Sequence, residues 1–325
     1  MAEYKGIKGY KVQSRASDPT VNEGQIWYNT ASSTLKYDTV AAGAWAAGGI
    51  MPGTKYFSGS MVGTQTASLY GGGNPGNVGN AYTYDGAAWT VITAMTTGRA
   101  NIGSSGAGTQ TAGIIYGGEI PGSPGRTPNT EEWNGSSWSE KANLGNERYA
   151  MAGDGTSTAA LCVDGAYPSG TTLVESWDGS SWTAGTASNY ARYALQGGGT
   201  QTSFLACGGK AGPATTYATS DEWNGTSWTT TPALNTGRQY GTGAAASGTS
   251  CLIFGGEAPP PHTKKTELWN GTSWTELADL TINTQKNAGS GTSALALSVG
   301  NESPNDGASY EWNSAPEVVK TVTVS

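Results

Sequence analysis

The sequence has little of the chemistry on which most enzymes depend. Its 325 residues include one histidine, three cysteines and only 13% charged residues. A single histidine excludes the usual copper and zinc sites, which draw on several nitrogen or sulfur ligands. No apolar run reaches the 18 residues of a membrane-spanning helix, and the N-terminus lacks the apolar stretch of a secretory signal. We therefore expect no metal, no cofactor and no membrane association.

Positive charge is also scarce. Lys and Arg number 17 against 24 Asp and Glu, which gives a formal net charge of −7. An acidic protein is repelled by the phosphates of nucleic acids and by anionic membranes. The composition therefore argues against nucleic acid as a partner.

The three cysteines, Cys162, Cys207 and Cys251, are 45 and 44 residues apart. Each lies in a short apolar run, with no CxxC pattern and no histidine nearby. This spacing predicts equivalent buried strand positions rather than a disulfide or a metal site.

Glycine, by contrast, is abundant, with 50 residues. Turn-forming residues interrupt the whole chain, and this pattern predicts an all-β fold.

One hexapeptide recurs: an aromatic residue, Asn-Gly or Asp-Gly, two small residues and a tryptophan. Its copies run between Trp133 and Trp138, Trp177 and Trp182, Trp223 and Trp228, and Trp269 and Trp274, with a weaker copy from Tyr84 to Trp89. Asn-Gly in this setting predicts a two-residue type I′ turn with positive φ at both residues.

The first aromatic residue of each copy defines a repeat. Including two incomplete copies, these anchors are Tyr37, Tyr84, Trp133, Trp177, Trp223, Trp269 and Trp312, at intervals of 47, 49, 44, 46, 46 and 43 residues. A period of about 46 residues is typical of a β-propeller blade of four strands. Seven anchors predict seven blades.

A second signature lies upstream of most anchors. Gly-Thr-Gln-Thr or a close variant begins at Gly63, Gly108, Gly155, Gly199, Gly248 and Gly291, and each copy precedes a short apolar strand. Most of these strands end in a pair of glycines, which indicates close approach of backbones. One unit therefore reads as strand, Gly-Thr turn, strand, Gly-Gly, variable loop, strand, Asn-Gly turn and strand.

The glycine pair and the paired aromatics resemble the kelch-type repeat, and the resemblance covers about residues 24–313. It implies a kelch-like β-propeller of four-stranded antiparallel blades. The sequence departs from that family in its tryptophan anchors, its short Asn-Gly connection and its Gly-Thr-Gln-Thr turn. The mechanics of the blade therefore carry over, and the partners of eukaryotic kelch proteins do not.

The two ends of the chain lack complete units. Residues 1–23 predict an arm or linker, and 24–325 a single propeller domain. Within it, 24–49 is predicted to be an incomplete first blade, followed by repeats at 50–98, 99–147, 148–191, 192–237, 238–285 and 286–325. The alternating β-branched tail 318–324 predicts a strand that pairs with or beside 24–49 to close the ring. Six blades with a separate N-terminal hairpin module are the alternative.

Residues 24–37, which begin Gly24-Gln25-Ile26-Trp27-Tyr28-Asn29, resemble openings of bacteriophage tail-fibre and related virion proteins. With the repeats, the chain is similar to kelch-like structural proteins of marine tailed phages. This resemblance implies a non-enzymatic virion protein made in the host cytoplasm. Its partners would be other virion proteins, through the N-terminal arm, and possible host-surface glycans. A lectin-like or carbohydrate-active protein is the alternative.

Cations recur in a fixed register, ten residues after the second aromatic of a unit. They are Lys55, Arg99, Arg148, Arg192 and Arg238, with Lys286 as a shifted sixth member. Two interpretations remain open. Each cation pairs with a repeated carboxylate or with backbone carbonyls and locks the ring, or the set forms a basic annulus that binds an anion such as a sugar acid or phosphate.

Candidates for catalysis are weak. His262 lies in a Pro-rich loop without a recognisable partner. The acidic residues Glu132, Glu175, Glu222, Glu267 and Glu311 recur just before the anchors, as structural residues do. We predict no catalytic residue, and the eight tryptophans from Trp133 to Trp274 are predicted to be structural. The variable loops after the glycine pairs are predicted to leave one face, where recognition is one use and neutral insertion another.

Overall fold

Strands and turns make up all the regular structure in the described part of the chain. The computed structural model describes residues 13–17, 26–40, 43–52, 58–121, 125–212, 215–258, 262–301, 307–314 and 317–321. None of these residues is helical, so they include no helix long and apolar enough to cross a membrane. Two units separate by their contacts: unit 1, Met1–Gly43 with Ser314–Ser325, and unit 2, Ala44–Asn313. The predicted all-β fold is confirmed.

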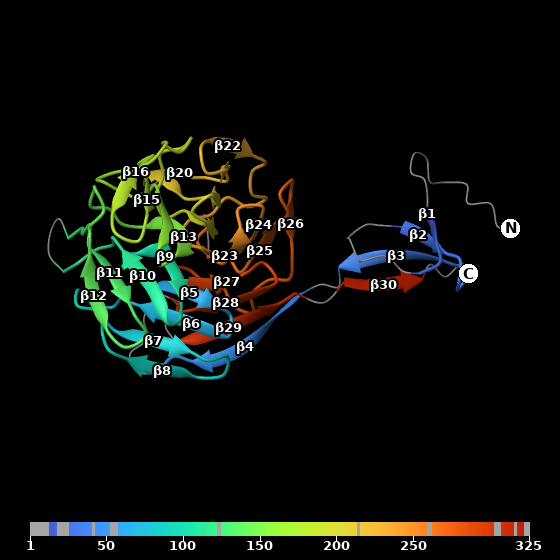
Figure 1. Ribbon diagram of the computed structural model, residues 1–325, viewed down its shortest axis with the longest axis horizontal. Helices are drawn as coiled ribbons and strands as arrows, with labels where there is room; N and C mark the ends of the chain where they lie inside the picture. Colours follow the sequence, from blue (N-terminus) through green and yellow to red (C-terminus); the bar gives the residue numbers. More distant parts are fainter. Residues whose placement is uncertain are drawn as a thin grey trace. The chain divides into compact units, whose positions relative to one another are not determined.

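Unit 2 consists mainly of six groups of four strands that follow one another in the sequence pattern, called blades 1 to 6 here (Figure 1). Blade 1 contains β5 (Ser60–Thr64), β6 (Ala67–Gly71), β7 (Ala81–Tyr84) and β8 (Trp89–Ile92). Blade 2 contains β9 (Gly103–Thr109), β10 (Ala112–Tyr116), β11 (Thr130–Trp133) and β12 (Trp138–Lys141). Blade 3 contains β13 (Met151–Thr156), β14 (Ala159–Val163), β15 (Val174–Trp177) and β16 (Trp182–Ala184). Blade 4 contains β17 (Gln196–Thr200), β18 (Ser203–Cys207), β21 (Ser220–Trp223) and β22 (Trp228–Thr231). Blade 5 contains β23 (Thr242–Ser247), β24 (Ser250–Phe254), β25 (Thr266–Trp269) and β26 (Trp274–Glu276). Blade 6 contains β27 (Ala288–Gly291), β28 (Leu295–Val299), β29 (Ala308–Asn313) and β4 (Ala44–Ile50). A short hairpin, β19 (Lys210–Gly212) and β20 (Thr215–Thr216), extends from blade 4.

The blades follow one another around a central axis. The first strand of each blade contacts the first strand of the next, from β5 through β9, β13, β17, β23 and β27 back to β5. Glycine is needed where these strands crowd together: a Cβ on Gly243 would lie 2.3 Å from the Gly197 carbonyl oxygen. The abundance of glycine thus follows from the convergence of strands at the axis.

Blade 6 is completed by chain from the other end of the sequence. β4 is its fourth strand, with Trp45 opposite Trp312 and Ala44 opposite Asn313. The two indoles are 5.6 Å apart, close to the 5.4 Å between Trp133 and Trp138 within blade 2. Closure of the ring by pairing of N- and C-terminal segments is therefore confirmed, and it leaves neither end of the propeller as an open edge.

The predicted count of seven blades is not confirmed. Six groups of four strands make up unit 2 among the described residues, and the groups of blades 2 and 3 join into one eight-stranded sheet because β9 pairs parallel with β13. Residues 24–49, predicted to be one incomplete blade, divide between two units: β4 joins blade 6, and the strands before it belong to unit 1. The reason is that Trp312 lacks an Asn-Gly hairpin after it, so its aromatic partner comes from Trp45 instead.

Unit 1 is a four-stranded sheet of order β1-β2-β3-β30. Its strands are β1 (Gln13–Arg15), β2 (Ile26–Asn29), β3 (Thr34–Val40) and β30 (Glu317–Thr321). The predicted C-terminal strand is present, and it pairs antiparallel with β3, Glu317 opposite Val40. The prediction that this strand closes the propeller is wrong, because it belongs to unit 1 and the pairing of β29 with β4 closes the ring. The predicted arm 1–23 contributes β1, which runs parallel to β2; its other residues lie outside the described part, apart from 16–17.

The Asn-Gly turn differs from the predicted type I′ geometry. Trp133 and Trp138 pair directly, so four residues form the connection. Only the glycine has positive φ, 93° at Gly135, and the Asn134 backbone does not. The Asn134 Oδ1 instead accepts hydrogen bonds of 2.9 Å from the amides of Ser136 and Ser137. The asparagine therefore shapes the turn through its side chain.

Adjacent blades are joined by the two repeated motifs. The glutamine of the Gly-Thr-Gln-Thr turn donates to the backbone carbonyl of the preceding blade's anchor, as from Gln201 Nε2 to Trp177 at 2.6 Å. Gln65 makes the same bond to Trp312 across the closure, also at 2.6 Å. The second tryptophan donates its indole N–H to the preceding blade, as from Trp138 to the Thr93 carbonyl at 3.0 Å.

The three cysteines are free and buried on the second strands of blades 3, 4 and 5. Their positions are not equivalent, which corrects the prediction: their cross-strand partners are Glu175 for Cys162, Ser220 for Cys207 and Trp269 for Cys251. Loops of unequal length between the blades bring their sequence spacing close to the repeat period. Burial raises the pKa of Cys162 and Cys207 to about 12, so neither thiol is ionised near neutral pH.

Closure by β4 can be tested with Trp45→Ala. This change removes a buried side chain that contacts Trp312 and Phe254 and donates to Thr266 Oγ1 at 2.9 Å. We expect a loss of about 3–5 kcal/mol in the free energy of unfolding, measured with urea. The control is Ile50→Ala on the same strand, where a 68% exposed side chain predicts a change within about 0.5 kcal/mol. Equal effects of the two changes would contradict closure by this strand.

Candidate functional site

The predicted cations occupy two different environments. The side chains of Arg99, Arg148, Arg192 and Arg238 are fully buried, on the connections that lead into blades 2 to 5. Lys286 is half-buried, and Lys55 lies outside the described residues. The four arginines therefore occupy equivalent positions in blades 2 to 5, as their spacing in the sequence predicts.

Each buried arginine pairs with a carboxylate two residues before the anchor of its blade. The pairs are Arg99–Glu131, Arg148–Glu175, Arg192–Asp221 and Arg238–Glu267. Arg238 also donates to the Lys265 carbonyl at 2.8 Å, while Glu267 accepts from the Asn235 amide at 2.8 Å. The arginine thus fixes the connection between blades to the third strand of the blade that follows.

These contacts favour the structural interpretation of the arginines. Their charges are neutralised and their side chains are closed to solvent, so no basic annulus of arginines faces a ligand. The carboxylates in blades 2 and 4 are Glu131 and Asp221, one residue before the expected Glu132 and Glu222. Arg192 contacts a second acid, Asp164 at 3.0 Å, and burial raises the pKa of Asp164 to about 7 against the opposing effect of Arg192.

A ring of backbone hydrogen bonds includes the residues two positions after the four arginines, with one member each from blades 1 and 6. Its members all have φ near +50°: Ser58, Asn101, Ala150, Ala194, Tyr240 and Lys286. The backbone amides of Ala150, Ala194, Tyr240, Lys286 and Ser58 each donate to the carbonyl of the member before them, at 2.7–2.8 Å. The ring closes through Ile102, the residue after Asn101, whose amide donates to the Ser58 carbonyl at 3.3 Å. This axial ring leaves a cavity of only about 20 Å³ at its end of the channel.

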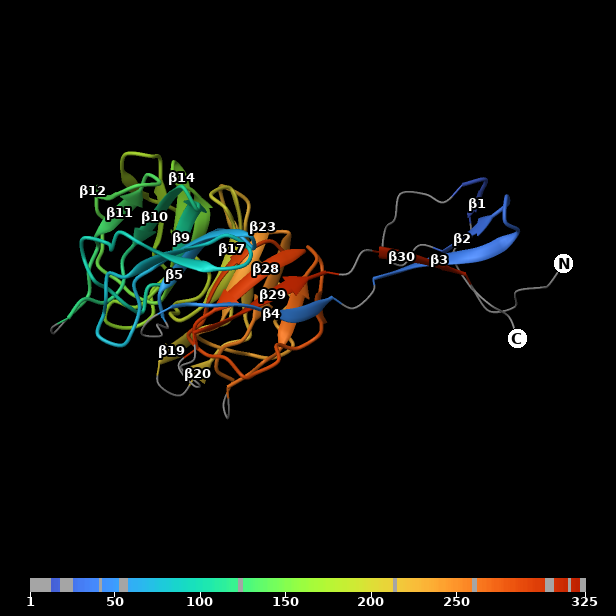
Figure 2. The same cartoon turned by 90° about the horizontal axis from the view of Figure 1, so that it is seen from below.

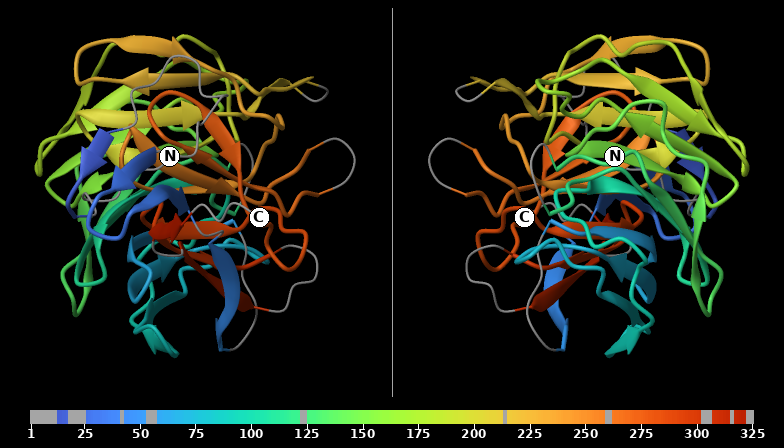
Figure 3. Two further views of the ribbon diagram at one scale, coloured as in Figure 1. Left: turned by 90° about the vertical axis from the view of Figure 1, so that its right-hand side faces the viewer. Right: turned by 90° about the vertical axis from the view of Figure 1, so that its left-hand side faces the viewer.

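Side chains around the axial ring vary from blade to blade. In each of blades 2 to 5, the residue after the arginine forms a backbone β-bridge with the residue that follows the glycine pair, or follows Asp164-Gly165 in blade 3. The bridges are Ala100–Glu119, Tyr149–Ala166, Tyr193–Lys210 and Gln239–Glu257. The buried arginine beside them does not change. We call Tyr149, Tyr193, Lys210, Tyr240 and Lys286 the tyrosine face. Figures 2 and 3 show the β19–β20 hairpin, which begins at Lys210, extending from the propeller.

The tyrosine face combines half-buried rings with ammonium groups. The Lys210 Nζ lies 5.1 Å from the centre of the Tyr193 ring and 4.9 Å from that of Tyr240, and the Lys286 Nζ lies 5.5 Å from Tyr240. The Tyr149 and Tyr193 rings are 6.1 Å apart. Burial raises the pKa of all three tyrosines, which keeps their hydroxyls neutral and able to donate. Burial also lowers the pKa of Lys210.

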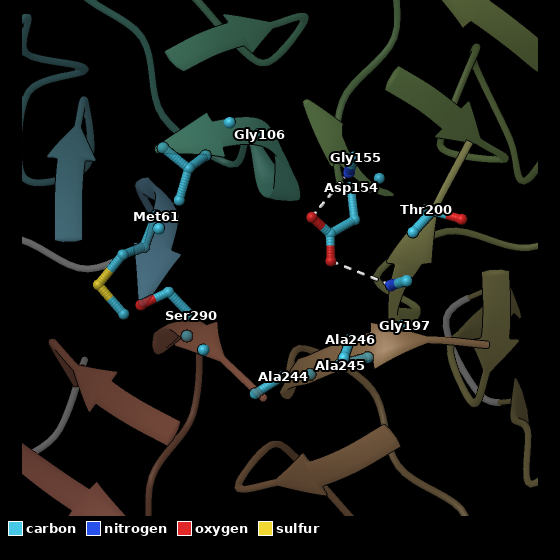
Figure 4. Close-up of a pocket in the computed structure, with 18 residues that line it drawn as sticks. Met61, Gly106, Asp154, Gly155, Gly197, Thr200, Ala244, Ala245, Ala246 and Ser290 are labelled. Atoms are coloured by element: carbon cyan, nitrogen blue, oxygen red, sulfur yellow. Dashed lines mark hydrogen bonds between the residues drawn. The ribbon is translucent and has the colours of Figure 1, made fainter. Parts of the chain in front are cut away.

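A second cavity occupies the other end of the channel. It measures about 220 Å³ and is lined by the first strands of all six blades, mostly by glycine and alanine (Figure 4). Asp154 is its one carboxylate among the lining residues, and its oxygens accept from the amides of Gly155 at 2.7 Å and Gly199 at 3.0 Å. Burial raises the pKa of Asp154 to about 7 against these two hydrogen bonds.

Metal-binding chemistry is limited in the described part of the chain. No group of three or more His, Cys, Asp or Glu side chains there is placed to hold an ion. His262, half-buried on the loop before β25, pairs through its backbone with Glu257.

The sequence interpretation missed the tyrosine face and Asp154. The signal was present in the repeat itself. Tyr149 and Tyr193 directly follow a register arginine, and Asp154 precedes a Gly-Thr turn at a position that is valine, alanine or glycine in blades 1, 2 and 4. Comparing the blades for differences, rather than for similarities, identifies these residues.

The fold and the channel define a β-propeller, and solved structures agree. One chain, titled "Structure of YjhT", matches with a TM-score of 0.68 over 84% of this chain and 99% of that chain, at 14% sequence identity. No family model and no curated protein matches the sequence. Similarity at this identity shows the fold alone, because propellers serve many unrelated functions.

The structural role of the arginines predicts the response to Arg238→Met. The change leaves the Glu267 carboxylate buried without its cation, so we expect a loss of about 3–5 kcal/mol in the free energy of unfolding. The double variant Arg238→Met/Glu267→Leu should recover most of that loss. Lys265→Met is the control, because its pair with Glu276 is exposed and worth at most about 1 kcal/mol. A double variant as unstable as Arg238→Met would reject the pairing argument.

Asp154 predicts a dependence of stability on pH. The pKa of Asp154 in the folded protein, about 7, lies above the ordinary value of 3.8. Its contribution to the free energy of unfolding is therefore fully present below pH 4 and is lost as the pH rises through 7. Asp154→Asn should therefore lose less stability than the native protein between pH 4.5 and pH 7.5, measured by urea unfolding. Asp178→Asn is the control, because hydrogen bonds lower the pKa of Asp178 to about 2 and asparagine is native at this turn position in other blades. Parallel pH curves for native protein and Asp154→Asn would contradict the raised pKa.

Proposed function

We propose that the chain is a non-enzymatic structural protein of a phage particle, a kelch-type propeller displayed on a tail fibre, spike or capsid appendage. The propeller is a rigid scaffold that presents the tyrosine face to host-surface glycans or to neighbouring subunits. One observation carries the proposal: buried contacts repeat from blade to blade, while the tyrosine face differs at the same repeat positions. Such variation on a constant frame is what a recognition surface requires.

The topology of the chain supports attachment through unit 1. Val40 pairs with Glu317 in unit 1, and Ala44 pairs with Asn313 in unit 2, so the chain enters and leaves the propeller at neighbouring residues. The propeller is thus an insertion into a small sheet that holds both the N-terminal and the C-terminal segments. In the proposed role, unit 1 contacts other virion proteins, as its resemblance to tail-fibre openings implies.

Binding without catalysis is proposed because the polar groups of the tyrosine face suit recognition. Neutral phenols and ammonium groups donate hydrogen bonds and offer apolar ring surface, as saccharide sites do. The nearby carboxylates Glu119 and Glu257 already accept from Asn101 at 2.5 Å and Gln239 at 2.7 Å.

A carbohydrate-active protein is the second candidate, favoured by Asp154. A carboxyl group whose pKa lies near 7, facing a cavity, is suited to general acid or base catalysis. This candidate places the chemistry in the channel and predicts released products.

The proposal is tested on a glycan array, with a parallel assay for polysaccharide cleavage and mass spectrometry of purified particles. We expect glycan binding without cleavage and the chain among the particle proteins. Tyr193→Ala should weaken binding by at least about tenfold, because it removes a central ring of the site. Val91→Ala, on the outermost strand of blade 1 with 61% of the residue exposed, is the control and should bind normally. Cleavage products, or absence of the chain from particles, would reject the proposal.

A further inference from the structure

The tyrosine face continues into a second cation and ring. The Arg126 guanidinium lies 5.2 Å from the centre of the Tyr167 ring, and Ala166, the residue before Tyr167, pairs through its backbone with Tyr149. Tyr149 in turn lies beside Tyr193. These contacts and the backbone pair Tyr149–Ala166 place seven residues in one series: Arg126, Tyr167, Tyr149, Tyr193, Lys210, Tyr240 and Lys286.

This series crosses several blades. Arg126 lies on the loop between β10 and β11 of blade 2, Tyr167 on the loop between β14 and β15 of blade 3, and Lys210 follows β18 of blade 4. Tyr240 and Lys286 lie on the connections into blades 5 and 6 and belong to the axial ring. A ligand that touched the whole series would be an extended molecule rather than a single small ring.

Hydrogen-bond donors exceed free acceptors along the series. Within the described ranges, the hydroxyls of Tyr149, Tyr193 and Tyr240 make no hydrogen bond, and Lys210 has no carboxylate within 4 Å. Arg126 has one distant ion pair, 3.9 Å to Glu147. A complementary ligand therefore supplies acceptors and negative charge.

The cations are held in place before any ligand binds. Lys210 lies against two ring faces, and Arg126 lies over a third. Contact with a ring favours one position of a long, flexible side chain, so less conformational entropy is lost when an anion binds. Two ordered cations on one surface can also engage two charges of one polymer, which raises the effective concentration of the second.

We propose that this series binds a segment of an anionic polysaccharide whose sugar units each carry a single negative charge, as a carboxylate or a sulfate ester. Sugar C–H faces pack on the tyrosine rings, and the charged groups pair with Lys210 and Arg126. The inference rests on the proposed function and names its ligand class. A net charge of −7 opposes every anionic polymer, and it opposes nucleic acid most, because duplex DNA carries about one charge per 1.7 Å of its length.

The experiment is calorimetric titration of the full chain with glucuronate oligomers of two and four units, their methyl esters, sulfated glucose oligomers and neutral glucose oligomers. We expect the charged four-unit oligomers to bind at least about tenfold more tightly than the esters and the neutral oligomers. They should also bind more tightly than the charged two-unit oligomers, because only the longer ones reach both cations.

Variants separate the two cations. Lys210→Met should weaken binding of the charged oligomers by about 10- to 100-fold, and Lys210→Arg should retain most of it. Arg126→Met should remove the advantage of four units over two. Lys264→Met is the matched control: it removes the same charge from an exposed residue on the loop before β25, paired with Asp279 at 3.7 Å. Thermal unfolding of each variant verifies that it is folded.

Equal affinity for acids and esters, or equal effects of Lys210→Met and Lys264→Met, would overturn the inference. So would the absence of binding to every oligomer. Tight binding of neutral oligomers alone would reject the anionic ligand and leave the proposed function standing. Mass spectrometry of particles tests the proposed function independently, since a chain missing from particles rejects the virion role whatever saccharide binds.

Discussion

The fold depends on closing a ring whose last blade is built from both ends of the chain. β4 and β29 pair through Trp45 and Trp312, so three strands of blade 6 come from the C-terminal part and one from the N-terminal part. Without this pairing, β29 and the first blade would lose a neighbour, and an unpaired strand would invite association with other chains. Closure therefore links the stability of every blade to contacts between residues about 270 positions apart in the sequence.

Around that ring, the interfaces draw on a small set of contacts. An indole N–H reaches the preceding blade from every blade, and a glutamine amide does so from blades 1, 2 and 4. A buried arginine fixes the connection into each of blades 2 to 5. Arg99, Arg192 and Arg238 each bond a carboxylate and a backbone carbonyl, whereas Nε and Nη1 of Arg148 have no hydrogen-bond partner among the described residues. The pairs specify one geometry for the connection, although a buried pair need not add much net stability. The axial ring follows two residues later, so the arginines also set where its backbone turns inward.

The constant frame leaves its surface free to vary. Residues next to the arginines and the glycine pairs point to one end of the channel, and there the blades differ. The cavity at the other end has nearly bare walls because its lining strands need glycine to approach the axis, and Asp154 is the exception. Recognition and structural support thus occupy neighbouring positions of the same repeat: Tyr149 and Tyr193 are half-buried on the tyrosine face, while the arginine before each of them is fully buried.

The sequence alone determined the all-β class, the blade unit and the arginine register, because these follow from local turn chemistry and from a period repeated several times. It did not determine the number of blades, since the partner of Trp312 lies at the far end of the chain and pairing of distant strands leaves no local pattern. It also gave no means of separating a buried arginine from an exposed one, because both have the same spacing. Only the tertiary structure decided that the arginines are neutralised inside the blades and that Tyr149, Tyr193, Lys210 and Tyr240 meet beside the axis, where consecutive blades converge.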